Sequence, residues 1–175
     1  MIMKTRPVVL MAVVAVLLLA GCYSYNDAEV QVRDIPRDKA WRVINNNLHE
    51  VVPSWDPNYP FPENPLSPPP NMTGCTTGKN SFASGPPWSM RVAQSLLEPT
   101  PLEIEQINMG FAALEARQYS YFDNPAKLNS ENKWIENDAG YAVQLWVDVG
   151  QDGTRSYELI SSSSCIRFDG DDQYK

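Results

Sequence analysis

The sequence predicts an α+β fold, a two-layer sandwich in which a small antiparallel sheet carries two main helices on one face. Two amphipathic helical patterns precede a C-terminal pair of strand patterns, so helices and strands are segregated along the chain rather than strictly alternating. The chain has 175 residues, of which 43% are hydrophobic and 20% charged. This length and composition suit one domain with its own buried core.

The first helix is expected to begin at Asp34, whose side chain can cap it, with Pro36 in the first turn. Pro53 ends it, because a helix seldom continues into the residue before a proline. Apolar residues recur between these limits at steps of three and four, which indicates one buried stripe. The stripe consists of Ala40, Trp41, Ile44, Leu48 and Val51.

A proline-rich arm is predicted over residues 53–70, which hold eight of the 15 prolines. Proline lacks a backbone donor, so this arm cannot be a helix or a central strand. Trp55, Tyr59 and Phe61 alternate with the prolines, and Trp88 follows the next loop. These four aromatic residues form either a recognition surface for a peptide, glycan or lipid, or a cover over the helix–sheet core.

The second helix carries the clearest start signal in the chain. Thr100-Pro101-Leu102-Glu103 is a capping box with proline at the first helical position. The apolar face that follows is formed by Ile104, Ile107, Phe111 and Leu114. Gly110 lies inside this helix and should weaken it slightly.

The strands are predicted from alternation of apolar and polar residues. One strand is expected at 88–93, a short one at 119–122, and a hairpin from strands 141–149 and 155–161 around a turn at 150–153. In the first hairpin strand Trp146 lies on the more exposed face. The opposite face carries Tyr141, Val143, Leu145, Val147 and Val149.

Residues 1–21 have the features of a signal peptide. Lys4 and Arg6 precede an unbroken run of 12 apolar residues, which is shorter than the roughly 20 needed to span a bilayer. Leu19-Ala20-Gly21-Cys22 resembles the bacterial lipobox. This resemblance implies cleavage before Cys22 and a diacylglycerol on its sulfur, with residues 22–33 as a tether. The alternatives are an ordinary secretory signal and an uncleaved anchor helix.

Export would place the two remaining cysteines in an oxidising compartment. Cys75 and Cys165 allow one pairing, and neither lies in a CxxC motif or beside a histidine. We therefore predict a structural Cys75–Cys165 disulfide, with a redox or nucleophilic thiol as the alternative. The bridge would join the end of the proline-rich region to the C-terminal strand.

The predicted domain spans 34–168 and is followed by an acidic tail at 169–175.

The composition excludes several classes of function. A net charge of −7 and a pI near 4.7 argue against a nucleic-acid partner, which requires a basic face. Three Cys and one His are too few for a Cys/His zinc site. No metal or cofactor is expected.

Several of these features together resemble the LppA-like lipoproteins of mycobacteria and related actinobacteria. They are the lipobox, the helix after a short tether, the segment Asn137-Asp138-Ala139-Gly140-Tyr141 before an alternating strand, and the final Cys165. The resemblance covers residues 35–167, and the long proline-rich arm departs from it. It implies a cell-envelope lipoprotein with no assigned activity and supplies no catalytic residues.

We therefore expect a non-enzymatic lipoprotein on the extracytoplasmic face of the cell membrane. It would contact the membrane through lipidated Cys22 and bind a protein or glycan partner at the cell surface. The alternatives are an envelope carbohydrate hydrolase, a lipid carrier with a hollow under its sheet, and a phage-encoded lipoprotein that excludes superinfection. The carboxylates for a hydrolase would be Asp148, Asp152 and Glu158.

Overall fold

The computed structural model describes residues 33–61, 72–75, 87–122 and 130–167. The predicted signal segment 1–21, Cys22, most of the tether, residues 62–70 of the arm and the acidic tail lie outside the described residues. The described residues cover most of the predicted α+β domain.

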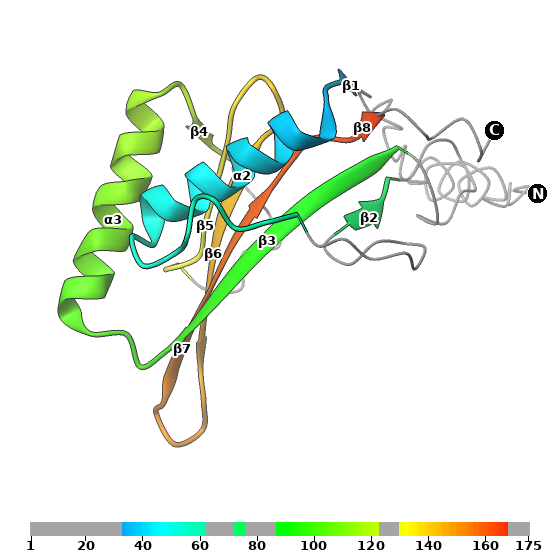
Figure 1. Cartoon of the computed structure of the whole chain (residues 1–175). Helices are drawn as coiled ribbons and strands as arrows, with labels where there is room; N and C mark the ends of the chain where they lie inside the picture. The colour runs from blue at the N-terminus through cyan, green and yellow to red at the C-terminus, as the bar shows by residue number, and fades with distance from the viewer. Residues whose placement is uncertain (1–32, 62–71, 76–86, 123–129, 168–175) are drawn as a thin grey trace, which may run out of the picture.

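Five antiparallel strands form the main part of the sheet, in the order β3-β7-β6-β5-β4. They come from both ends of the domain, so β3 lies beside β7 although the two are far apart in sequence (Figure 1). Their bounds are Trp88–Leu97 for β3, Ser120–Tyr121 for β4, Lys133–Glu136 for β5, Ala142–Val149 for β6 and Arg155–Ser162 for β7.

Three short strands extend this sheet beyond β3. Strand β2 (Met72–Gly74) pairs antiparallel with the start of β3, and β8 (Ile166–Arg167) pairs with Trp88 on the same strand. Strand β1 (Arg33–Asp34) lies parallel to β8. The first described residue of the chain is therefore held beside the last described strand.

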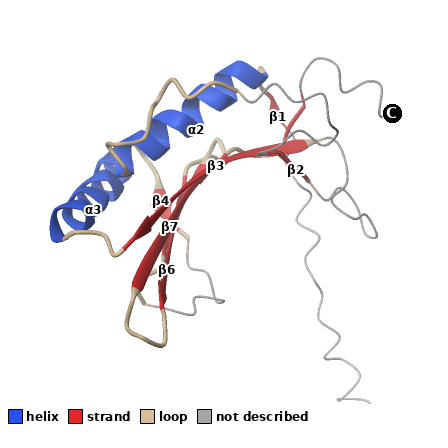
Figure 2. Cartoon of the chain, turned by 60° about the horizontal axis from the view of Figure 1, so that its bottom comes forward, coloured by secondary structure: helices blue, strands red, loops and turns tan. Residues whose placement is uncertain are grey.

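Both helices, α2 (Arg37–Val51) and α3 (Pro101–Ala116), lie on the same face of the sheet. Figure 2 shows them on one side of the strands, with no described helix on the other side. The predicted α+β two-layer architecture is confirmed. We call the second side, which no described helix covers, the helix-free face.

The core fills the space between the helices and the sheet. The whole predicted stripe of α2 is buried, as are three of the four apolar residues predicted to line α3. Ile104, the fourth, is partly buried against the same cluster. The fully buried side chains include Ile44, Leu48, Met90, Ile107, Phe111, Leu114, Ile135, Val143 and Leu159.

The two helix starts differ in how well the sequence predicts them. The capping box of α3 is confirmed: the Thr100 hydroxyl accepts from the Glu103 backbone N–H at 3.2 Å, and the Thr100 backbone N–H donates to the Glu103 carboxylate at 2.7 Å. The predicted cap of α2 is wrong. Asp34 lies in β1, and Pro36 occupies the N-cap position without a side-chain cap bond.

Gly110 lies where α3 passes close to the backbone of α2. A Cβ atom at this position would lie 2.4 Å from the Glu50 carbonyl oxygen and 2.6 Å from the Val51 Cα. Real Cβ atoms do not approach a backbone this closely, so only glycine fits. The residue predicted to weaken α3 is therefore the one that lets the two helices meet.

The predicted disulfide is present between Cys75 and Cys165, with Cα atoms 6.1 Å apart. It links the residue after β2 to the residue before β8. Beside it, the Arg33 backbone N–H donates to the Cys165 carbonyl oxygen at 2.9 Å. The disulfide therefore lies at the point where the N-terminal segment enters the fold.

Candidate functional site

The described part of the proline-rich arm packs against α2. The Trp41 ring lies 5.0 Å from that of Phe61, and the Trp41 indole N–H donates to the Tyr59 carbonyl oxygen at 2.7 Å. The Trp55 indole N–H donates to the buried Asn45 side chain at 2.9 Å. These contacts favour the predicted cover over the core. Tyr59 alone among the arm aromatics keeps substantial exposure, at 42%.

Trp88 does not belong to a binding surface. Its side chain is 4% exposed and forms part of the hydrophobic core. The prediction that it contacts a partner is therefore wrong. Its position at the start of β3, on the helix-covered side, is the physical reason.

A different set of aromatic residues gathers on the helix-free face. Strand registers place Trp134 of β5 opposite Gln144 of β6, and Gln144 opposite Ile160 of β7. Phe122, directly after β4, donates its backbone N–H to the Trp134 carbonyl oxygen. Because side chains alternate along a strand, these residues form one row across the sheet. Trp146 follows two residues after Gln144 on the same face.

This row is partly open to solvent. Phe122 is 54% exposed, and both Trp134 and Trp146 are half-buried. The rings of Phe122 and Trp134 lie 5.1 Å apart, and the Trp146 indole N–H donates to the Gln144 side-chain oxygen at 3.0 Å. The aromatic groups are thus held by each other and by the strands before any ligand binds.

Charged groups border the row on both sides. Arg91 of β3 forms an ion pair with Glu158 of β7 at 2.9 Å. The two residues are not directly opposite each other, because the strand register places Ser95 opposite Glu158. Glu136 of β5 lies opposite Ser120 and Ala142, one row further along the sheet. The face therefore offers aromatic rings beside planar polar side chains.

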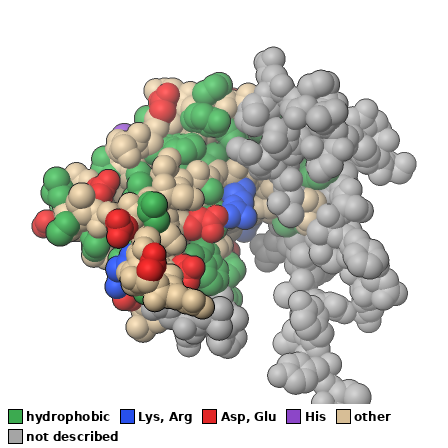
Figure 3. All heavy atoms as spheres, turned by 90° about the horizontal axis from the view of Figure 1, so that it is seen from below, with side chains coloured by type: hydrophobic (Ala, Val, Ile, Leu, Met, Phe, Trp, Pro, Cys, Tyr) green, Lys and Arg blue, Asp and Glu red, His purple; other side chains and the backbone are tan. Residues whose placement is uncertain are grey.

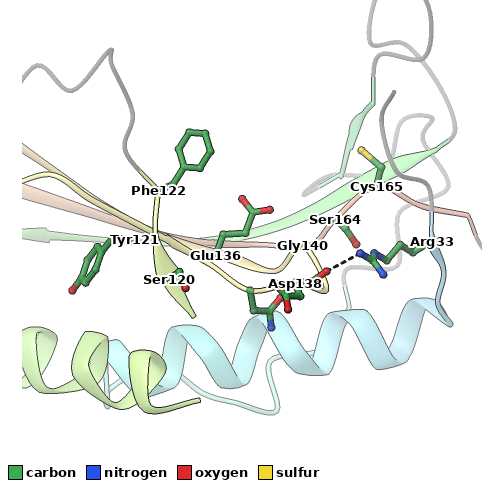
Figure 4. Close-up of a pocket in the computed structure, with 10 residues that line it drawn as sticks. Arg33, Ser120, Tyr121, Phe122, Glu136, Asp138, Gly140, Ser164 and Cys165 are labelled. Carbon is green, nitrogen blue, oxygen red and sulfur yellow. Dashed lines mark hydrogen bonds between the residues drawn. The ribbon is translucent and has the colours of Figure 1, made fainter. Parts of the chain in front are cut away.

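A pocket of about 560 Å³ opens at the β4 end of the row (Figure 4). It is lined by Ser120, Tyr121 and Phe122, by Glu136 and the turn from β5 to β6, and by Arg33 with Ser164 and Cys165. In Figure 4 Phe122 and Glu136 point to the side away from the helices, whereas Tyr121 points toward them. The pocket thus continues the helix-free face around its edge.

Glu136 is the pocket's distinctive titratable group. Burial raises the pKa of its carboxyl above the ordinary value, and the neighbouring Trp134 side chain opposes this shift. The Arg33 guanidinium lies at the far end of the pocket and donates to the Asp138 carbonyl oxygen at 2.7 Å. Among the described residues, no lysine or arginine forms an ion pair with Glu136.

The carboxylates considered for a hydrolase serve the β6–β7 hairpin instead. Asp152 accepts the Thr154 backbone N–H at 3.0 Å, and Asp148 accepts that of Val149 at 3.0 Å. Glu158 is paired with Arg91. In the pocket, the Glu136 and Asp138 side chains point to different sides in Figure 4. Each of the three carboxylates predicted for a hydrolase is thus engaged in a contact within the sheet or its hairpin.

The helix-covered side holds a smaller cavity of about 210 Å³, between α3 and the strands. Apolar side chains such as Ile107, Leu145 and Val147 form part of its wall, and the polar Asn108, Glu131 and Lys133 line it as well. Its volume lies below the 300–1,000 Å³ typical of ligand pockets. It does not form the large apolar hollow expected of a lipid carrier.

Acidic side chains prevail over basic ones on the side of the molecule seen in Figure 3. Within the described ranges, no three His, Cys, Asp or Glu side chains gather as metal ligands. The described helices include none of the length and hydrophobicity needed to cross a membrane.

No family model, curated protein or solved structure matches the chain. The resemblance to LppA-like lipoproteins, the lipid anchor and the phage alternative therefore stay predictions. The residues of the row across the helix-free face were not singled out by sequence analysis, apart from Trp146 on the exposed side of its strand. Residues 133–136 show no alternation of apolar and polar side chains, so the sequence carries no periodic signal for this part of the row.

Proposed function

We propose that this chain is a bacterial lipoprotein, anchored through Cys22 at the extracytoplasmic face of the cell membrane, whose helix-free face binds an extended glycan of the envelope. The glycan would be uncharged or positively charged. The observation that carries the proposal is the row of Phe122, Trp134 and Gln144 with Trp146 beside it. The lipobox at Cys22 supports the location.

The chemistry of the row suits a sugar chain. Aromatic rings offer flat apolar surfaces on which the C–H faces of a pyranose can stack, at little cost in side-chain entropy. Gln144 and the neighbouring carboxylates offer planar hydrogen-bonding groups for hydroxyls. Neighbouring strands lie about 4.8 Å apart, which is close to the length of one pyranose in an extended glycan. Successive sugars can therefore meet successive strands.

The shape of the row favours a chain. The row crosses five strands in one line, over a length of roughly 19 Å. The excess of acidic groups on the chain, with a net charge of −7, would repel an anionic polymer.

The position of the anchor also suits a glycan of the envelope. Cys22 and Arg33 are eleven residues apart, so the tether can span at most about 40 Å when fully extended. A ligand of the domain must therefore lie close to the membrane surface. Polysaccharides of the envelope satisfy this requirement without a second protein.

Calorimetric titration tests the proposal directly. The purified protein in detergent micelles would be titrated with an N-acetylglucosamine hexamer, and its sedimentation with insoluble chitin, an uncharged polymer of the same sugar, would be measured. We expect binding to both, and at least tenfold weaker hexamer binding by Phe122→Ala, which removes an exposed ring. The control is Tyr59→Ala, an exposed aromatic on the α2 side, which should bind as the parent does.

Absence of binding to either glycan would overturn the proposal, as would equal loss in the control variant. Retention of full affinity by both Phe122→Ala and Trp146→Ala would exclude the helix-free face as the site. Capture of a protein that requires Phe122, without any glycan binding, would assign the face to a protein partner instead.

A further inference from the structure

The pocket at the β4 edge and the helix-free face share two residues, Phe122 and Glu136. We propose that this pocket is a subsite for a primary ammonium group, so that the bound glycan contains amino sugars with free amines. The inference rests on the proposed function, because it places the ammonium on a glycan already held by the row. The juxtaposition of Glu136 and the Phe122 ring at the end of that row carries it.

Glu136 is a partly desolvated carboxylate in need of a cation. It is half-buried, and its removal from water raises its pKa. Four described arginines form ion pairs, with Asp38, Glu50, Glu131 and Glu158. No described lysine or arginine forms an ion pair with Glu136. A ligand ammonium would supply the missing positive charge in a charge-assisted hydrogen bond.

Phe122 adds a second attraction for the same group. Its ring points to the same side of the sheet as Glu136 in Figure 4. The face of an aromatic ring attracts a cation within about 6 Å of its centre. A carboxylate and an aromatic face beside one open pocket are the usual elements of ammonium recognition.

The remaining charges around Glu136 leave this preference in place. Asp138, from the turn between β5 and β6, is exposed and adds a second negative charge to the pocket. Arg33, from β1, is the one described basic residue in the lining, and it is held at the far end by the Asp138 carbonyl oxygen. Ser120 and Ala142, which flank Glu136 on β4 and β6, carry no charge.

The position of the pocket favours an amino sugar in the chain itself. Glu136 follows Trp134 by two residues on β5, so it lies on the same face, about 7 Å to one side of the row. Phe122 lies opposite Trp134 on the neighbouring segment, and Ser120 lies opposite Glu136. An amine on the sugar stacked at Phe122 or Trp134 would therefore point toward Glu136.

Two hexamers that differ only in acetylation test the inference. Calorimetry at pH 6 would compare the glucosamine hexamer with the N-acetylglucosamine hexamer. We expect the parent protein to bind the glucosamine hexamer about tenfold more tightly. Glu136→Gln should lose this preference while it keeps its affinity for the acetylated hexamer.

Asp148→Asn is the matched control. It removes one negative charge from the same helix-free face of the sheet as Glu136, but on β6 and away from the pocket. It should keep the preference. Equal affinity of the parent protein for both hexamers would overturn the subsite and leave glycan binding standing. An equal loss in Glu136→Gln and Asp148→Asn would reduce the preference to general charge attraction and also overturn the subsite. Failure of both hexamers to bind would overturn the proposed function itself.

Discussion

Replacement of Gly110 by alanine tests a close contact between the two helices. Judged from helix propensity alone, Gly110→Ala should stabilise α3 by about 1 kcal/mol. The structure predicts the opposite sign. The new Cβ would lie 2.4 Å from the Glu50 carbonyl oxygen, and relief of this clash requires α2 and α3 to separate by about 1 Å.

The obstacle is backbone, which cannot rotate away as a flexible side chain can. Separation would loosen the buried contacts of Val51, Phe111 and Leu114 along the helix interface. Overpacking of this kind costs about 1–3 kcal/mol and occasionally more. Because the clash is with backbone, we expect the upper end of this range, about 3 kcal/mol, and after the gain in propensity a net loss of about 2 kcal/mol in the free energy of unfolding. For a domain of this size, the loss corresponds to roughly 4–8 °C in Tm.

Urea unfolding followed by tryptophan fluorescence would measure the difference. Met109→Ala is the control, because its side chain is 65% exposed on the same helix and its removal should change stability by less than about 0.5 kcal/mol. An increase in stability for Gly110→Ala would refute the close helix crossing.

Three further predictions follow from the same structure. Cys165→Ser should lower the free energy of unfolding by up to about 4.6 kcal/mol, because the disulfide closes a loop with a sequence separation of 90 residues. In unfolding measurements, a reductant should destabilise the parent protein but leave the variant unchanged. Glu103 accepts hydrogen bonds from Thr100, which lowers the pKa of its carboxyl, so the stabilisation is present above the ordinary carboxyl pKa and is lost as the pH falls through the lowered value. Glu103→Gln should therefore destabilise the protein at pH 7 and have no effect in strong acid. An equal effect at both pH values would contradict this. Tyr119→Phe should lower the free energy of unfolding by about 1–3 kcal/mol, because it leaves the buried Asn47 amide without its hydrogen-bond partner at 2.9 Å. Tyr141→Phe should be nearly neutral, because the buried Tyr141 hydroxyl has no hydrogen-bond partner in the described structure. Thermal unfolding would compare the two variants, and equal losses of stability would exclude the explanation.

The elements that the sequence predicts well are those fixed by local interactions. The capping box at Thr100 and the apolar stripe of α2 both depend on neighbours within a few residues, and both are present. The hairpin follows in the same way from alternation around a turn. The two-layer fold was predictable because these elements leave only one apolar surface each to bury.

What the sequence could not predict depends on contacts between distant segments. Strand β5 is four residues long, too short for a periodic signal, and only its register with β6 brings Trp134 beside Gln144. Gly110 looks like a defect until α2 is placed against it. Trp88 and Tyr59 are both aromatic residues near prolines in the sequence, yet the fold buries Trp88 and leaves Tyr59 at the surface.

The lipid anchor at Cys22 is the claim on which the proposed compartment and the proposed envelope glycan both depend. Its most direct test is the intact mass of the protein purified from membranes, with and without Cys22→Ala. We predict a mass equal to residues 22–175 plus acyl chains, and loss of that species in the variant. An unmodified soluble mass, or a chain that retains residues 1–21, would contradict the anchor and with it the proposed location.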